Sequence, residues 1–417
     1  MMTHSSRRHF LHTVAAGTAL VTGRSSIASA LAQSPAGSDA AFWETVRAQF
    51  SFTENTVPMN AANLCPAPRA VADRLEELTR SVDRDCSSQN RRQFTSLLEH
   101  SRHKVAAQLG ASPDEIALVR NTSEANNIIN NGLPLQDGDE VVVWDQNHPT
   151  NHVAWQVRGA RFGIRVVSVS TPPQPTGVDE LVGAFERAMT PRTRVLALTH
   201  VSNTTGIKLP VRELSEVARS RGIYIHLDGA QTWGAVNVDL DDLGCDSYTA
   251  SVHKWFCGPR EVGLLYVKAE HIQDIWPGTV GTNWGDDLEP DPGGARKFES
   301  LGQRDDAALA AVETAADFHD AIGLDRTEAR VTELASMLKA GLVEAGYALV
   351  TPENPDLSAG VCIANAAAEQ RGRLVNGLYE QYGIAGAGTG GLRLSPHVYN
   401  TPAHIARAIE GANSLRE

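Results

Sequence analysis

Seven short apolar runs between residues 116 and 267 constrain the fold more than any other feature of this sequence. The first five are rich in β-branched residues and bounded by charges or glycines, which is typical of buried parallel strands. Helical patterns lie between them, and one of these ends at a helix-stop glycine, Gly222. We therefore expect an α/β domain with a seven-stranded, mostly parallel sheet. The runs are "IALVR", "EVVVWD", "RVVSVS", "RVLALTHV", "IYIHLDGA", "DSYTAS" and "VGLLYV".

The pattern changes after Phe298. Two long helical patterns follow, and then short apolar runs such as "YALVT", "GVCIAN" and "GLRLSP" around one further helix. This order predicts a smaller α+β domain at the C-terminus. The predicted division is an N-terminal segment at 33–65, a large domain at 66–304 and a small domain at 305–417.

Residues 1–32 resemble a twin-arginine signal peptide. Arg7 and Arg8 precede a dilute apolar stretch, small residues stand at Ala30 and Ala32, and no acid occurs before Asp39. Cleavage after Ala32 is expected, with export to the periplasm or otherwise out of the cytoplasm by the twin-arginine machinery. The alternative is a disordered basic tail, which the absence of acids disfavours.

Charge and cysteine content narrow the class of protein. The net charge of −12 becomes −15 once three arginines leave with residues 1–32, which disfavours nucleic-acid and anionic-membrane binding. No stretch of the mature chain is long and apolar enough for a membrane span. The five cysteines lack metal-ligand spacing, so no metal site is expected, and their odd number leaves room for one disulfide at most beside free thiols. They are Cys65, Cys86, Cys245, Cys257 and Cys362.

Five of the predicted strands end beside polar side chains. Ligands of an open α/β sheet bind beyond the carboxyl ends of the strands, so these side chains should share one site. Pyridoxal phosphate (PLP) needs such a set: a helix start with hydroxyls for the phosphate, a lysine for the aldehyde and a carboxylate for the pyridine nitrogen. The residues are Thr122, Ser123 and Glu124, then His148, Asn203, Asp228, Gln231, Ser251, His253 and Lys254.

The segment "DGAQTWG" followed by "SVHKWFCGP" resembles the class V aminotransferase family of PLP-dependent enzymes, which includes cysteine desulfurases and isopenicillin N epimerases. Further similar segments occur in the order of the family, through most of the mature chain. The resemblance implies a fold type I PLP-dependent transferase with pyridoxal 5'-phosphate as cofactor. It also implies a homodimer with an active site at the two-fold interface. These segments are "MNAANLCPAPRAV", "RNTSEANN", "NHPTNHVAW", "THVSNTTG" and "LRLSPHVYNT".

The same resemblance assigns roles to individual residues. It implies that Lys254 binds the cofactor aldehyde through its amine, that Asp228 pairs with the pyridine nitrogen and that His148 stacks on the ring. These three are the catalytic residues expected. Gln231 would bond the phenolic oxygen, while Asn203 and Arg393 would bind the substrate carboxylate. The phosphate ligands implied are Thr122, Ser123, Ser251 and His253.

One contact of the family departs from its pattern here. A threonine after "FE-x-G" reaches the phosphate of the neighbouring subunit in the family, whereas this chain reads "FESLGQRD". Gln303 stands where the hydroxyl is expected, with one extra residue before Gly302, and its amide is still a donor. The glycine-rich loop 277–287, with Trp284 expected to be exposed, is either a crossing between subunits or an ordinary surface loop.

The sequence leaves the reaction open. An amine such as Lys254 that moves a proton at the α-carbon serves transamination, epimerisation and β-elimination alike. The segment "GIAGAGTGGLRLS" before Arg393 lacks the cysteine nucleophile of desulfurases, which makes cysteine desulfurase activity unexpected. The leading hypothesis is an aminotransferase acting on a small-molecule amino acid or a peptide-borne amino group. The alternatives are an epimerase similar to isopenicillin N epimerase, a C–S lyase, and a non-catalytic binding module.

Overall fold

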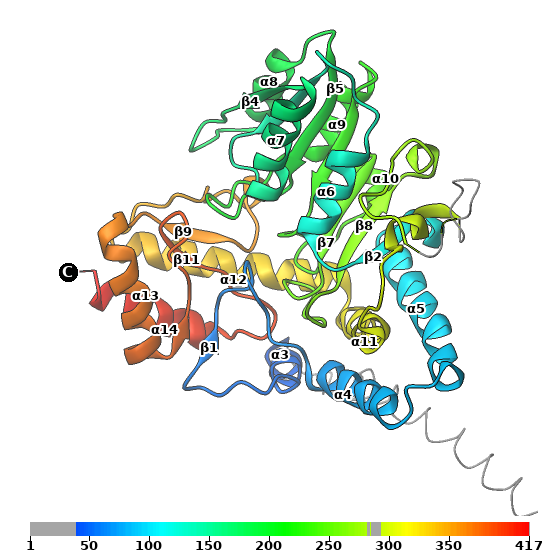
Figure 1. Ribbon diagram of the computed structural model, residues 1–417. Coiled ribbons are helices and arrows are strands. Elements are labelled where there is room, and N and C mark those ends of the chain that lie inside the picture. Colours follow the sequence, from blue (N-terminus) through cyan, green and yellow to red (C-terminus); the bar gives the residue numbers. More distant parts are fainter. Residues whose placement is uncertain (1–38, 282–283, 285–292, 417) are drawn as a thin grey trace, which may run out of the picture.

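The computed structural model describes residues 39–281, 284 and 293–416. The signal peptide predicted at residues 1–32 lies outside the described residues. A seven-stranded sheet forms the centre of the large domain, in the order β2-β8-β7-β6-β5-β3-β4 (Figure 1). Its strands coincide with the seven predicted runs. They are β2 (Ile116–Val119), β3 (Glu140–Trp144), β4 (Arg165–Val169), β5 (Thr193–Thr199), β6 (Tyr224–Asp228), β7 (Ser247–Ser251) and β8 (Gly263–Val267).

The sheet is mixed. The neighbours from β4 through β3, β5 and β6 to β7 are parallel, as expected. Strand β8 runs antiparallel to both β7 and β2, so β2 has no parallel neighbour. Strand β4 also differs from the prediction of a buried strand, because it is the edge strand and exposes Arg165 and Ser168 to solvent. An edge strand needs apolar residues only where a helix covers it.

Successive residues of the central strands enter two separate cores. On β3, Val142 and Trp144 pack with helices α5, α8, α9 and α11, while Val141 and Val143 pack with α6 and α7 on the other face. This is the period of two expected for a sheet covered on both faces. The helices are α4 (Arg69–Arg84), α5 (Ser88–Gln108), α6 (Thr122–Gly132), α7 (Val153–Phe162), α8 (Val178–Ala188), α9 (Val211–Arg219), α10 (Leu240–Leu243) and α11 (Asp306–Ile322).

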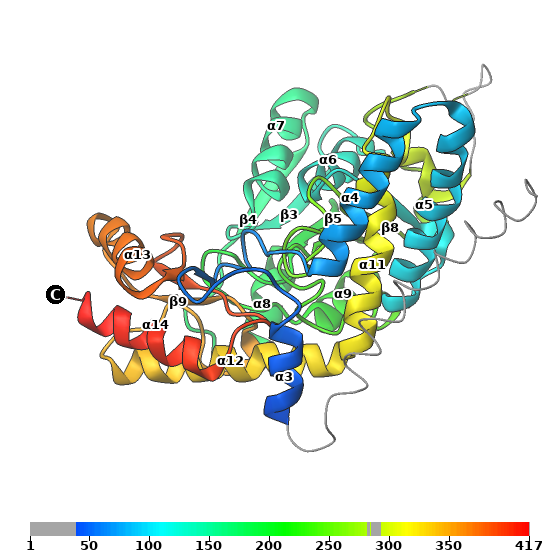
Figure 2. The same cartoon turned by 90° about the horizontal axis from the view of Figure 1, so that it is seen from below.

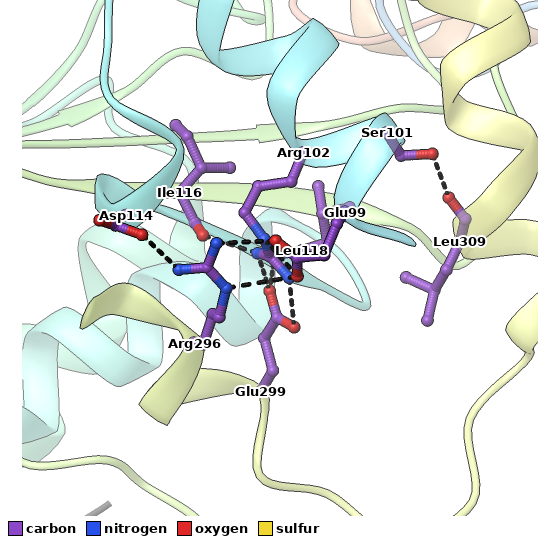
Figure 3. Close-up of polar contacts among 9 residues, drawn as sticks. All are labelled: Glu99, Ser101, Arg102, Asp114, Ile116, Leu118, Arg296, Glu299 and Leu309. Carbon is purple, nitrogen blue, oxygen red and sulfur yellow. Dashed lines mark hydrogen bonds and ion pairs between the residues drawn. The ribbon is translucent and has the colours of Figure 1, made fainter. Parts of the chain in front are cut away.

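A buried ion-pair cluster closes the outer edge of β2 (Figure 3). The carboxylate of Glu299, at the end of the short helix η4 (Gly294–Glu299), accepts a hydrogen bond from the amide of Leu118. Arg102, which is 1 % exposed, donates to Glu299 and to the carbonyl of Ile116 at 2.7 Å. Because removal of one partner of a buried ion pair costs about 3–5 kcal/mol, this cluster holds β2 firmly. Strand β2 leads directly into α6.

The small domain contains two short sheets against three helices. Strands β9 and β11 are antiparallel, and β10 pairs in parallel with β1 (Val57–Pro58) of the N-terminal segment. Helix α12 runs from the large domain to the small one (Figure 1). The elements are α12 (Leu324–Glu344), β9 (Cys362–Ala364), α13 (Ala368–Tyr382), β10 (Ile384–Ala385), β11 (Leu392–Leu394) and α14 (Pro402–Ser414).

Two contacts cross the predicted domain limits. Helix α11 begins just after the predicted boundary at residue 305 and packs along α4 and α5 of the large domain (Figure 2). The N-terminal segment carries α3 (Asp39–Arg47) and then completes the small sheet through β1. None of the described helices combines the length and the apolar character that a membrane crossing requires.

Candidate active site

The start of α6 forms one wall of the site. Asn121 caps the helix by accepting from the amide of Glu124 at 3.0 Å. The amide of Thr122 donates to the hydroxyl of Ser251 at the end of β7 at 2.9 Å, and the two hydroxyls lie 2.6 Å apart. Ser123 follows in the same first turn and is exposed. A helix N-terminus with adjoining hydroxyls suits a phosphate, so three of the predicted phosphate ligands lie together.

Gly263 permits this arrangement. It begins β8, beside β7, and a Cβ at this position would lie 2.6 Å from Cα of Asn121. Any side chain there would displace the cap of α6. The glycine therefore allows the neighbouring strand to approach the helix start closely.

Asp228, at the carboxyl end of β6, is 1 % exposed and its two oxygens are both hydrogen-bonded. One accepts from the amide of Ala230 at 3.0 Å. The other accepts from the side-chain amide of Asn126, on α6, at 2.9 Å. A buried carboxylate with fixed donors keeps its orientation, as the partner of a pyridine nitrogen must.

Asn126 was not among the predicted site residues. Its side-chain oxygen accepts from the hydroxyl of Thr249 at 2.6 Å and lies 3.1 Å from Nε2 of His226. Burial lowers the pKa of His226 to about 3, so this imidazole is neutral near pH 7. These contacts place the amide nitrogen of Asn126 on Asp228. The same nitrogen also donates to the hydroxyl oxygen of Thr150 at 3.1 Å.

Thr150 extends this network to His148. The hydroxyl of Thr150 lies 3.0 Å from Nδ1 of His148, which precedes the short helix η2 (Pro149–Asn151). Burial lowers the pKa of His148; the Asp228 carboxylate opposes this shift and the Lys254 amine adds to it. The charges of Asp228 and Lys254 therefore both act on the His148 imidazole.

Lys254 follows β7 and is half-buried. Burial lowers the pKa of its amine, the carboxylate of Asp228 raises it, and the guanidinium of Arg393 lowers it further. The charges of an acid on the large domain and of a cation on the small domain thus both act on Lys254. A lowered pKa raises the neutral fraction of the amine, which is the form that attacks a carbonyl or accepts a proton.

Gln231 is held by two contacts. Its amide nitrogen donates to the carbonyl of Ala62 at 2.9 Å, and its oxygen accepts from the indole of Trp255 at 2.8 Å. One amide hydrogen remains for a ligand. His253 is half-buried, and burial together with Lys254 lowers its pKa to about 4.

Arg393 lies on β11 and is 4 % exposed. It donates to the backbone carbonyl of Asn203 and to the side-chain oxygen of Asn60, each at 3.1 Å. Its Nε is buried without a partner, and no Asp or Glu of the described residues forms an ion pair with it. Burial lowers the pKa of Arg393 to about 10. A buried cation with unmet donors fits an anionic ligand.

Two further predictions concern contacts with a neighbouring subunit. Gln303 is exposed, and its amide donates to the carbonyl of Arg304 at 2.7 Å. Of the loop 277–287, residues 282–283 and 285–287 lie outside the described residues. Trp284 is half-buried rather than exposed, with its ring stacked 6.4 Å from that of Trp276, which is itself 60 % exposed.

The residues present fit PLP. The start of α6 and Ser251 offer donors to a phosphate, Lys254 offers an amine of lowered pKa, and Asp228 offers an oriented carboxylate. The sequence missed Asn126 and Asn60, although both lie in segments that carry the family resemblance. Other polar residues surround Asn126 in "RNTSEANN" and a second asparagine follows Asn60 in "MNAAN", so nothing in the sequence singles either residue out.

Known proteins resemble this chain along most of its length. An isopenicillin N epimerase of Amycolatopsis lactamdurans is 32 % identical over 392 residues, covering 89 % of this chain and 98 % of the relative. A probable cysteine desulfurase of Methanothermobacter thermautotrophicus is 30 % identical over 306 residues, covering 71 % and 75 %. A solved structure of a C-DES mutant with glycine covalently linked to the PLP cofactor superimposes with a TM-score of 0.81 at 22 % identity, covering 88 % and 98 %.

The expectation that cysteine desulfurase activity is unlikely is not supported, because several relatives carry that name. The missing loop cysteine does not by itself separate this chain from them. The family model described as Aminotransferase class-V matches residues 61–406 of this chain. The chain therefore belongs to the class V aminotransferase family, with fold type I and pyridoxal 5'-phosphate as its cofactor.

Proposed function

We propose that the protein acts at the α-carbon of an amino acid, free or at the end of a peptide, and that its reaction is a transamination. The observation that carries this proposal is Arg393, a buried guanidinium with an unpartnered Nε and no acidic partner among the described residues. Its charge lowers the pKa of the Lys254 amine. A substrate with a carboxylate next to its amino group matches this pair.

PLP supplies an electron sink that stabilises negative charge at the α-carbon. Asp228 keeps the pyridine nitrogen protonated, because its carboxylate is buried and fixed by Asn126. Arg393 orients the carboxylate of the substrate. Lys254 then removes the α-proton and returns it elsewhere, and the lowered pKa of its amine favours the neutral form that this role needs.

Epimerisation is the second candidate. It shares the removal of the α-proton and differs only in where the proton returns. The 32 % identity to an isopenicillin N epimerase over nearly the whole of that enzyme supports it. A C–S lyase would share the same first step and release sulfide from a cysteine-type substrate.

The first experiment tests Lys254. Purified wild-type protein is mixed with PLP and reduced with borohydride, and the labelled peptide is identified by mass spectrometry. We expect the label on the peptide with Lys254, loss of the visible absorbance band in Lys254→Ala, and no change in the control Lys268→Ala, whose amine pairs with Glu270 at the surface. A label on another lysine would disprove the assignment.

A second experiment separates the reactions. Amino acids and short peptides are incubated with the PLP-loaded protein in D₂O, and loss of the α-proton signal is followed by NMR. Exchange with formation of a keto acid identifies transamination, exchange with inversion identifies epimerisation, and sulfide from cysteine identifies C–S cleavage. Exchange in none of the substrates, despite bound PLP, would favour a binding module.

We also propose a homodimer that loads PLP in the cytoplasm and is then exported by the twin-arginine machinery. The family resemblance and the pattern of residues 1–32 support this. Replacing Arg7 and Arg8 by lysine should leave a PLP-loaded, uncleaved dimer in the cytoplasm. A periplasmic double mutant would contradict the export route, and a PLP-loaded monomer in solution would contradict the shared site.

A further inference from the structure

Two cysteines far apart in the sequence meet behind the candidate active site. Cys65 follows β1, and Cys257 lies three residues after Lys254. Their sulfur atoms and one ring nitrogen of His397 all lie within 4.8 Å of one another. Cys65 is 4 % exposed and Cys257 is fully buried. The sequence leaves room for one disulfide without indicating which cysteines pair, because spacing cannot show which segments meet.

The surroundings fix both thiols. The hydroxyl of Tyr399 donates to the sulfur of Cys65 at 3.4 Å, and the thiol of Cys257 donates weakly to the carbonyl of Trp255 at 3.6 Å. Cys257 has a φ of 53°, in the left-handed region that residues with a Cβ seldom adopt. The fold thus holds an unfavoured backbone conformation at the residue whose thiol faces Cys65.

The segment that carries Cys65 also supports the site. The amide of Cys65 donates to the carbonyl of His253 at 2.9 Å, next to Lys254. The carbonyl of Ala62 holds Gln231, and the side chain of Asn60 holds Arg393. A covalent bond from Cys65 to Cys257 would tie this segment to the turn that carries Lys254.

We propose that Cys65 and Cys257 form an intramolecular disulfide that fastens residues 60–65 to the Lys254 turn. The oxidant is a small-molecule disulfide. The Cys65 sulfur attacks one sulfur of the oxidant and loses its proton, and the S–S bond of the oxidant breaks to release one thiol. The Cys257 sulfur then attacks the mixed disulfide and releases the second thiol. Two protein thiols are oxidised and one disulfide is reduced to two thiols.

The order of attack follows from access. Cys65 is slightly exposed and adjoins Leu64, which is 41 % exposed, whereas Cys257 is enclosed. Burial raises the pKa of the Cys257 thiol well above its usual value, and the neighbouring Cys65 raises it further. Cys65 is therefore the thiol that meets the oxidant first.

A metal site is the competing use of these residues. Two thiolates and an imidazole are ligands that zinc accepts. Nε2 of His397 donates to the carbonyl of Trp255 at 2.6 Å, which leaves the buried and unpartnered Nδ1 as the nitrogen that could bind a metal. Only these three ligands gather here among the described residues, one fewer than a structural zinc site uses, which favours a thiol pair with a neighbouring imidazole, and the experiment distinguishes the two.

The test uses the full folded protein with oxidised glutathione. Excess oxidant is removed, the protein is denatured in acid to stop thiol exchange, and its free thiols are then counted with a maleimide at neutral pH in denaturant. We expect a cross-linked peptide pair containing Cys65 and Cys257, and a count that falls from five to two because the exposed Cys86 also forms a mixed disulfide with glutathione. Cys86→Ser, at an exposed position, should lose the same two thiols and fall from four to two. Cys65→Ser should leave the Cys257 thiol free of any intramolecular cross-link.

Three outcomes would overturn the proposal. The first is a wild-type count that falls no further than four after prolonged oxidation, through the loss of Cys86 alone. The second is a cross-link that joins a different pair. The third is bound zinc, measured by elemental analysis, together with protected thiols and no cross-linked peptide. None of these readouts depends on the reaction proposed above, and the wild-type measurement stands even if a variant fails to fold.

Discussion

The surroundings of Asp228 and of Arg393 differ in one respect that matters for function. Both side chains are buried and both carry charge. Each oxygen of Asp228 accepts a hydrogen bond from the protein, from Ala230 and from Asn126. Arg393 keeps an unpartnered Nε and forms no ion pair with a described acid. The Asp228 carboxylate is thus held in place before any ligand binds, whereas the Arg393 guanidinium has no described counterion until an anionic ligand binds.

This difference separates two kinds of site. Donors that are already oriented need no reorganisation when a charge develops near them, so the Asp228 region is suited to act during the chemical step. A buried cation without a counterion is costly until an anion arrives, so the Arg393 region is suited to select what binds. The following predictions test this division, from the largest effect to the smallest.

Asp228→Asn should lower kcat by about 10²–10³-fold, because the neutral amide no longer stabilises a protonated pyridine nitrogen. PLP occupancy, measured by absorbance, should change little, since Lys254 and the start of α6 remain. A matching loss of cofactor and of kcat would assign Asp228 to retention of the cofactor instead.

Arg393→Ala should raise KM by about 10–100-fold, because charge-assisted hydrogen bonds to the substrate carboxylate are lost. The value of kcat should change far less. Arg373→Ala, at an exposed position on α13, is the control and should leave both constants unaltered. If Arg393→Ala lowered only kcat, Arg393 would act in the chemical step and not in substrate selection, contrary to the proposed division.

Asn126→Ala should lower kcat by about 10-fold, because it removes a donor from the buried Asp228 carboxylate. The control is Asn130→Ala, one turn further along α6 and equally buried. Asn126→Asp should be worse than the alanine variant, since it sets two carboxylates against each other. An equal loss in both alanine variants would indicate general damage to α6.

His226 gives the smallest effect, on stability rather than on rate. Its pKa is about 3 in the folded protein and about 6.5 when unfolded, so the unfolded chain binds the additional proton between these values. Its contribution to stability is complete above pH 6.5 and decreases as the pH falls toward 3. At pH 5.5 the loss is about 1 kcal/mol.

Urea unfolding of the wild type and of His226→Gln at pH 7 and pH 5.5 measures this loss. The variant should lose less stability on acidification by about that amount, because glutamine does not titrate in this range. Equal losses in both proteins would mean that other groups, not His226, determine the acid sensitivity.

The sequence predicted the strands well because each is a short apolar run bounded by charges. It did not predict that β2 pairs antiparallel with β8, since strand order depends on contacts between distant segments. The exposure of Arg165 and Ser168 on β4 was not predicted, because a valine-rich strand looks the same at an edge and in the middle of a sheet.

The site was predictable where chemistry demands a rare residue type. Lys254 and Asp228 were named because an amine and a carboxylate at strand ends are unusual. Asn126 and Asn60 were not, because asparagine is common in helices and loops, and only packing places their amides against Asp228 and Arg393. Trp284 was expected to be exposed because a sequence does not show that Trp276 lies beside it.

The pairing of β1 with β10 has a consequence for the order in which the protein matures. Residues 57 and 58 can pair only after residues 384 and 385 have been synthesised. The bridge from Asn60 to Ser395 needs a still longer chain. At about 5–20 residues per second, the ribosome needs on the order of tens of seconds between the two segments. During that time Arg393 does not yet exist, so the proposed substrate site cannot form on a nascent chain that has not yet reached this residue.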